Sequence, residues 1–214
     1  MTLRAWIASA LLCLGSLVAD ASDAQESAPR LDVGLRGVVL LSKGEPANDM
    51  IGEGLLFRWR LRDAWHIGIA FDAVTFDYET PNKALGIVSA TVVDGTNDLS
   101  RASVLLERRY ESDRRWDWFW LVGVGTASID APNVAGRRAD GSTFDIATEA
   151  DEELHVFAGG GLRRPLGARW ALETTFTVEH HTTEYELMDR VSGARGTIGA
   201  QSPYGIAIGV SYRF

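Results

Sequence analysis

The chain of 214 residues contains a single cysteine and two lysines, and it has no long apolar run after residue 24. The one cysteine, Cys13, excludes an internal disulfide and a cysteine metal cluster. A net charge of −8 argues against nucleic acid as a partner. Because a membrane-spanning helix needs about 18 apolar residues or more, we expect none after residue 24.

The first 24 residues have the layout of a secretory signal peptide. Arg4 precedes the apolar stretch 5–19, and small residues follow at 19–21 and 22–24. The apolar stretch is shorter than the roughly 20 residues that a spanning helix needs. We therefore expect residues 1–24 to be a cleaved signal peptide, residues 25–29 to be a short disordered lead-in and residues 30–214 to form one domain.

Residues 30–214 alternate between apolar and polar side chains in eight segments. In the last one, every second residue from Tyr204 to Phe214 is aliphatic or aromatic, and small residues and Arg213 lie between them. The segments are longer than the usual strand of about 5–6 residues and close to the 9–11 that a tilted strand needs to cross a bilayer. The eight segments lie at residues 31–39, 55–62, 65–72, 100–110, 118–125, 154–163, 170–181 and 203–214.

The connections between these segments alternate in length. Short connections at 62–65, 111–116 and 164–169 alternate with longer ones at 42–51, 77–99, 128–152 and 185–202. Short periplasmic turns and long extracellular loops are typical of transmembrane barrels. The sequence therefore predicts an all-β, eight-stranded antiparallel transmembrane up-and-down β-barrel, with both termini in the periplasm.

The tryptophans of this domain all lie at strand ends beside the short connections. Amphipathic rings are favoured at a membrane–water boundary, so we expect one aromatic girdle there. The predicted girdle consists of Trp59, Trp65, Trp116, Trp118, Trp120, Trp170, Tyr212 and Phe214. A soluble lipocalin-like barrel with its apolar face turned inward is the alternative, and the long strands and the girdle argue against it.

The terminal strand Tyr204–Phe214, with its final phenylalanine, and the turn Pro165–Trp170 resemble those of the small eight-stranded outer-membrane barrels of Gram-negative bacteria, the OmpA/OmpX type. The resemblance implies that the barrel-insertion machinery reads the C-terminal strand. It also implies contact with outer-membrane lipid and lipopolysaccharide. We expect a monomer without a cofactor. The architecture itself hosts adhesins, anchors, small pores and lipid-modifying enzymes, so it does not specify a function.

The predicted inward face carries both arginines and carboxylates. Side chains can fill the lumen of an eight-stranded barrel, and unpaired charges there are costly. We therefore expect a charge-paired interior, with an ion-selective small pore as the alternative. The predicted network consists of Arg36, Arg58, Arg60, Asp72, Glu107, Arg109, Glu173, Glu179 and Arg213.

Residues 179–184 form the densest group of reactive side chains. On the lipid-facing phase, His180 precedes Thr182, an arrangement in which a histidine can activate a hydroxyl for acyl transfer. It is similar to the His-x-Ser-Asn motif of outer-membrane lipid A 3-O-deacylases, with threonine in place of serine. This similarity implies His180 as the base, Thr182 as the nucleophile and Glu184 as an orienting group.

The opposite phase places His155, Glu179 and His181 toward the lumen. Pairing of the two strands about Gly167 predicts that His155 lies opposite Glu179. Two imidazoles and a carboxylate are candidate ligands of a divalent metal, although we expect hydrogen-bonded lumen residues and no metal.

The long loops at 77–99 and 128–152 are rich in aspartate and glutamate. Such carboxylates can bridge to lipopolysaccharide phosphates through divalent cations, serve as a ligand-binding surface or form a solvated surface, and we expect the last. The sequence thus predicts a non-enzymatic outer-membrane barrel with a structural role or an interaction surface.

Overall fold

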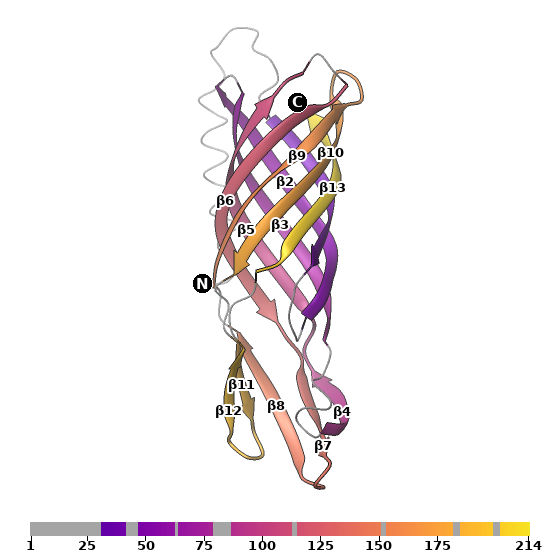
Figure 1. Ribbon diagram of the computed structural model, residues 1–214, viewed down its shortest axis with the longest axis vertical. Coiled ribbons are helices and arrows are strands. Elements are labelled where there is room, and N and C mark those ends of the chain that lie inside the picture. The colour runs from indigo at the N-terminus through magenta and orange to yellow at the C-terminus, as the bar shows by residue number, and fades with distance from the viewer. Residues whose placement is uncertain are drawn as a thin grey trace. The chain divides into compact units, whose positions relative to one another are not determined.

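The computed structural model describes residues 31–41, 47–62, 64–78, 87–112, 115–150, 153–181, 185–198 and 202–214. Eight of its strands close into an antiparallel barrel (Figure 1). They are β1 (Leu31–Leu41), β2 (Ala47–Arg62), β3 (Trp65–Tyr78), β5 (Asp98–Tyr110), β6 (Asp117–Asp130), β9 (Glu153–Pro165), β10 (Trp170–His181) and β13 (Tyr204–Arg213). The predicted fold class is confirmed. The predicted signal peptide and lead-in lie outside the described residues.

The barrel closes because its first and last strands pair. β1 pairs with β2 on one side and with β13 on the other. The backbone N–H of Phe214 donates to the carbonyl oxygen of Leu31 at 2.9 Å, so these two residues lie together at the end of the short turns. Closure gives every barrel strand a partner on both sides, which a sheet needs in hydrocarbon, where no water can satisfy a free edge.

Side chains alternate between the lumen and the outer surface along each strand. In β5, the odd-numbered residues from Arg101 to Arg109 are buried, and the even-numbered ones reach the outer surface. Large apolar side chains are exposed around the barrel, among them Leu35, Leu55, Val104, Val122, Val124, Leu162, Phe176, Val178, Ile208 and Val210. Soluble monomers rarely expose so continuous an apolar surface, and we interpret it as a lipid-facing belt. No helix among the described residues is long and apolar enough to cross a membrane.

The long connections differ from the irregular loops that the sequence predicts. They form a second antiparallel sheet, here called the loop sheet, with the strand order β12-β11-β8-β7-β4. Its strands are β4 (Ile87–Asp94), β7 (Asn133–Arg138), β8 (Thr143–Ala150), β11 (Tyr185–Asp189) and β12 (Arg195–Ile198). Its small core contains Ile87, Val134 and Phe144. β7, β11 and β12 have only six, five and four residues, which give little alternation to detect, and the eight-residue β4 does not alternate strictly between apolar and polar side chains.

Several barrel strands, among them β2, β3 and β6, also extend further than predicted. β2 begins at Ala47 and β3 continues to Tyr78, so the predicted connections 42–51 and 77–99 are shorter than expected. Pairing between Leu41 and Asp49 extends the β1–β2 ladder into the first of these segments.

Inward side chains fill the lumen in alternating charged and apolar layers. Along β5 from the short-turn end, Glu107 is followed by Leu105, then by Ser103 and Arg101, then by Leu99. The middle apolar layer joins Leu56, Ala70 and Leu105, with Phe157 packed against them. The apolar layer furthest from the short turns joins Val38, Leu40, Met50, Val74, Leu99, Ala127 and Ile129. The lumen is therefore a packed core and not purely polar.

The lipid-facing belt predicts different effects for two similarly exposed leucines. Leu35 lies in the middle of β1 and is 56% exposed, whereas Leu61 lies at the short-turn end of β2 and is 59% exposed. An arginine on the lipid face costs about 2–4 kcal/mol at the bilayer midplane and about 0–1 kcal/mol near the interface. In phospholipid vesicles, L35R should therefore lower the free energy of unfolding by about 2–4 kcal/mol, and L61R should lower it by about 0–1 kcal/mol. Equal, small effects in denaturant titrations would contradict a lipid-facing belt.

Candidate functional site

The charged layer nearest the short turns is built around Arg58 and Glu107, which are 1% and 0% exposed. Arg58 donates to Glu107 Oε2 at 3.0 Å and to the two carboxylate oxygens of Glu173 at 2.6 and 2.7 Å. Arg109 donates to Glu107 at 2.5 Å and to Asp32 at 2.6 Å. We call this group the inner charged layer.

The inner layer is completed by two further arginines. Arg163 donates to Glu173 at 3.1 Å, and Arg213 donates to Asp32 at 3.3 Å. Its members are the arginines Arg58, Arg109, Arg163 and Arg213 and the carboxylates Asp32, Glu107 and Glu173. Buried charges are tolerated only with such partners, because each charge loses its hydration.

A second, outer charged layer lies beyond the apolar layer of Leu105. Arg36 binds Asp72 through two nitrogens at 2.8–3.0 Å. Arg101 bridges Asp72, at 2.9 Å, to Glu179. The absence of a side chain at Gly205 makes room for this layer, because a Cβ there would collide with Glu179.

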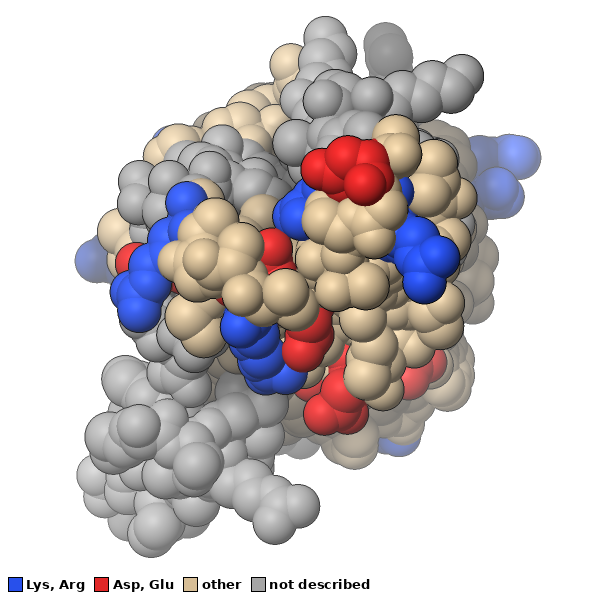
Figure 2. Space-filling model, turned by 90° about the horizontal axis from the view of Figure 1, so that it is seen from below, with Lys and Arg blue, Asp and Glu red and all other residues tan. Residues whose placement is uncertain are grey.

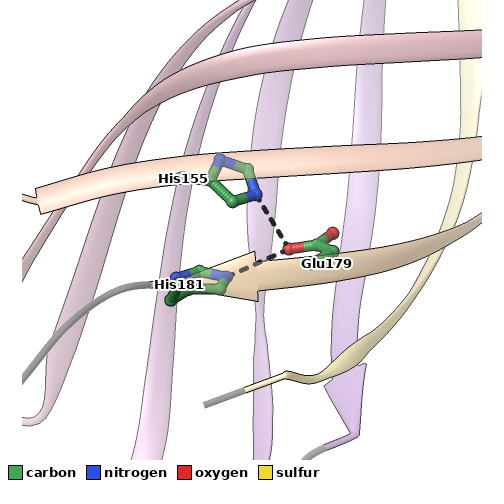
Figure 3. A group of neighbouring side chains, drawn as sticks. All are labelled: His155, Glu179 and His181. Atoms are coloured by element: carbon green, nitrogen blue, oxygen red, sulfur yellow. Dashed lines mark hydrogen bonds and ion pairs between the residues drawn. The ribbon is translucent and has the colours of Figure 1, made fainter. Parts of the chain in front are cut away.

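Two histidines converge on the same carboxylate oxygen of Glu179 as Arg101 does. His155 Nε2 and His181 Nε2 lie 3.2 and 3.3 Å from Glu179 Oε2 (Figure 3). The remaining oxygen, Oε1, accepts a hydrogen bond from the Thr177 hydroxyl at 2.8 Å. All three members of the cluster are buried.

The pairing expected for His155 was wrong by two residues. His155 lies opposite His181, and Phe157 lies opposite Glu179. The reason is the turn between β9 and β10: Pro165 pairs with Ala171, which leaves five residues, 166–170, between these two and centres the hairpin on Ala168 instead of Gly167. Glu179 still reaches His155 diagonally across the two strands.

The structure places most of the predicted network residues in the two charged layers. Those in the layers are Arg36, Arg58, Asp72, Glu107, Arg109, Glu173, Glu179 and Arg213. Arg60 lies on the inward face opposite His66, but it is exposed at the rim. Sequence reasoning left out Asp32, Arg101 and Arg163. Arg101 is in phase with Glu107 and Arg109, so the alternation of side chains could have identified it as an inward residue.

Two cavities in the described part of the lumen are small. One cavity lies beside the outer layer, and the volume in which the centre of a water molecule fits there is about 30 Å³. The residues that line it include Arg36, Asp72, Arg101, His155 and Glu179. A second cavity has about 10 Å³. Since one water needs roughly 10–15 Å³ by this measure, these spaces hold only one or a few waters.

The candidate acyl-transfer group is only partly described. His180 is exposed on the outer surface of β10, opposite Val156. Its Nδ1 lies 3.0 Å from the hydroxyl of Ser202. Thr182 and Glu184 lie outside the described residues. The hydroxyl that the structure places beside His180 is therefore that of Ser202, which sequence spacing does not reveal.

Aromatic side chains gather at the short-turn end of the barrel. Tyr110 stacks on Trp118 at 3.8 Å, and Trp65 meets Trp120 edge-on at 5.4 Å. Arg108 lies over Trp65, at 5.4 Å from the ring centre. Trp170 and Phe214 also belong to this group, and both contact Tyr212 edge-on. The remaining members are Trp116, which Arg164 covers, and Trp59, which lies in β2 between Leu31 of β1 and Ile67 of β3. Guanidinium groups beside ring faces suit a boundary between lipid and water.

Some of the described carboxylates of the loop sheet accept hydrogen bonds from groups within the sheet. Asp189 accepts hydrogen bonds from the Ser192 hydroxyl at 2.6 Å, the backbone N–H of Asp145 at 3.0 Å and Arg138 at 3.2 Å. Burial raises the pKa of Asp189, but these hydrogen bonds outweigh it and hold the pKa well below its usual range. Seen from this end, basic and acidic side chains are interspersed (Figure 2). The described surface is therefore mixed in charge.

The inner layer predicts that Glu107 is a main contributor to stability. Glu107→Gln removes one charge between Arg58 and Arg109, and breaking a buried ion pair in this way costs about 3–5 kcal/mol. Denaturant unfolding in detergent micelles should show a loss of this size. Glu111→Gln is the control, because Glu111 is exposed just beyond the end of β5, the strand that carries Glu107. This substitution should change the free energy of unfolding little. A Glu107→Gln protein as stable as this control would show that the pairing is unimportant.

No protein-family model matches the chain, and neither does any curated protein. Solved structures of similar fold include the outer membrane protein OprG from Pseudomonas aeruginosa, with a TM-score of 0.58 and 11% identity over 90% of this chain and 99% of that one. Neisserial surface protein A has a TM-score of 0.54 and 9% identity over 88% and 100%. The outer membrane protein AlkL, solved in lipid bilayers, has a TM-score of 0.51 and 18% identity over 91% and 94%. The chain therefore has the fold of the small eight-stranded outer-membrane β-barrels.

Proposed function

We propose that this protein is an integral outer-membrane barrel that does not conduct ions and that displays its loop sheet as an interaction surface outside the cell. The observation that carries the proposal is the loop sheet itself. Three separate connections of the barrel pair with one another to build it, whereas independent flexible loops would not.

Strand pairing and hydrogen bonds between these three connections support an interaction surface of defined shape. β8 pairs with β11 from a later connection, and β7 pairs with β4 from an earlier one. Asp189 links them further, through Arg138 and the backbone of Asp145. Side chains held in this way lose less conformational entropy on binding than those of flexible loops, which favours recognition.

The edge strand β4 supports a protein or peptide as the binding partner. Among the described residues, β4 pairs only with β7, and Val88, Val92 and Val93 are 56–66% exposed on it. A strand edge with apolar side chains can receive an added strand from another chain. The apolar belt and the aromatic girdle support outer-membrane lipid as the surrounding medium, with lipopolysaccharide around the outer rim.

The filled lumen supports the absence of conduction. Reconstituted in planar bilayers, the protein should give no steady current steps, because the two cavities described above hold only one or a few waters and the inner layer and its apolar neighbours fill the lumen that the described residues enclose. Co-flotation of the protein with lipid vesicles controls for insertion. Reproducible unitary currents from inserted protein would instead support the small-pore alternative.

The direction of the barrel can be tested with two matched alanines. Ala139 is exposed in the turn between β7 and β8, and Ala168 is exposed in the short turn between β9 and β10. The chain's only cysteine is Cys13, within the predicted signal peptide. On intact cells, a membrane-impermeant maleimide should label Ala139→Cys and should label Ala168→Cys only after lysis. The reverse pattern would place the loop sheet in the periplasm and refute its display.

A further inference from the structure

The outer charged layer contains two histidines that are not needed to neutralise its carboxylates. Glu179 is already neutralised by Arg101, yet His155 and His181 also direct their Nε2 atoms at its Oε2. Two imidazole nitrogens and one carboxylate oxygen are a common donor set for a transition metal. We propose that His155, Glu179 and His181 form a binding site for a divalent transition metal ion, best suited to zinc.

The spacing of the donor atoms supports this proposal. In a tetrahedral site with bonds of about 2.0–2.1 Å, neighbouring donor atoms lie about 3.3–3.4 Å apart. Glu179 Oε2 lies 3.2 Å from one imidazole nitrogen and 3.3 Å from the other. All three ligand atoms lie within 4.8 Å of one another. An ion can thus replace the hydrogen atoms between these donors with only small side-chain shifts.

The surroundings already orient the ligands. His155 Nδ1 lies 3.4 Å from the Ser103 hydroxyl, which leaves Nε2 as the nitrogen for an ion. Thr177 holds the second oxygen of Glu179. Metal-binding histidines and carboxylates usually have such secondary partners, which set their orientation.

The adjacent cavity provides a fourth ligand position. His155, Glu179 and Ser103 all line the cavity of about 30 Å³, which has room for a water molecule beside the cluster. Three protein ligands with one water is an arrangement that zinc commonly adopts. His181 is the last residue of β10, at the end where that strand leads into the long connections. An ion approaching from that end passes the apolar layer that contains Leu40 and Leu99, and it meets this cluster before the inner layer.

Arg101 is the group with which the ion must compete. It occupies the same oxygen of Glu179, and it has a second carboxylate partner in Asp72 at 2.9 Å. When a cation binds Glu179, Arg101 can keep its pairing with Asp72. The cluster is therefore stable without a metal, and binding is expected to be reversible.

The test is isothermal titration of untagged protein, extracted from membranes in detergent, with zinc chloride and with calcium chloride. We expect one zinc ion per chain and no calcium binding, because two nitrogen donors disfavour calcium. His155→Gln and His181→Gln should each weaken zinc binding by more than about 100-fold, beyond the effect of losing an outer-shell partner. His180→Gln is the matched control, because this neighbouring side chain points outward, and it should bind as the unaltered protein does.

Arg101→Gln separates a metal site from an ordinary hydrogen-bonded cluster. Removing the competing guanidinium should raise zinc affinity, whereas general damage to the lumen would lower it. Cobalt(II) provides a second measurement, since tetrahedral coordination gives intense visible absorption, which His181→Gln should abolish. The proposal is overturned if the unaltered protein binds no zinc, if zinc binds His155→Gln and His181→Gln unchanged, or if only His180→Gln loses binding.

Discussion

The hydrocarbon core of a membrane offers no water to an unpaired backbone N–H or C=O, and this constraint determines the rest of the structure. The β1–β13 ladder meets it by closing the sheet. Closure with eight strands leaves a lumen narrow enough for side chains to fill, so inward residues have to pack like a protein core. Outward residues meet lipid and can be aliphatic at nearly every position, which explains the large exposure of Leu35 and Ile208.

Apolar side chains alone could fill the lumen. The charged layers, however, also affect how apolar the chain is before it folds. An inward face of aliphatic residues would turn each strand into a continuous apolar segment. Polar residues at many of the inward positions keep the unfolded chain amphipathic and still allow burial once their partners are in place. The partners come from distant strands: Arg58 of β2 joins Glu107 of β5 to Glu173 of β10. These ion pairs form fully only when the barrel is closed, so they couple the strands to one another.

The sequence predicts what depends on alternation and misses what depends on turns and on short strands. The direction of Glu107, of Arg109 and of the outward Val104 follows from a period of two, because strand geometry leaves no other choice. The position of His155 opposite His181 depends on the length of one turn, which alternation does not specify. The loop sheet was not predicted because some of its strands, such as β12 with four residues, are too short to show a pattern, and the longer β4 does not alternate strictly. Ser202 reaches His180 only through tertiary structure.

The two charged layers differ in how freely they can change. The inner layer has four arginines, Arg58, Arg109, Arg163 and Arg213, against three carboxylates, Asp32, Glu107 and Glu173, and its surplus charge lies on Arg213, whose side chain is 30% exposed at the rim. The outer layer has two arginines against two carboxylates, with two histidines in addition. The apolar layer of Leu56, Ala70 and Leu105 separates them. Charge can therefore be rearranged in the outer layer while the ion pairs of the inner layer stay in place, so the outer layer is the part of the barrel in which a bound ion would disturb the lumen packing least.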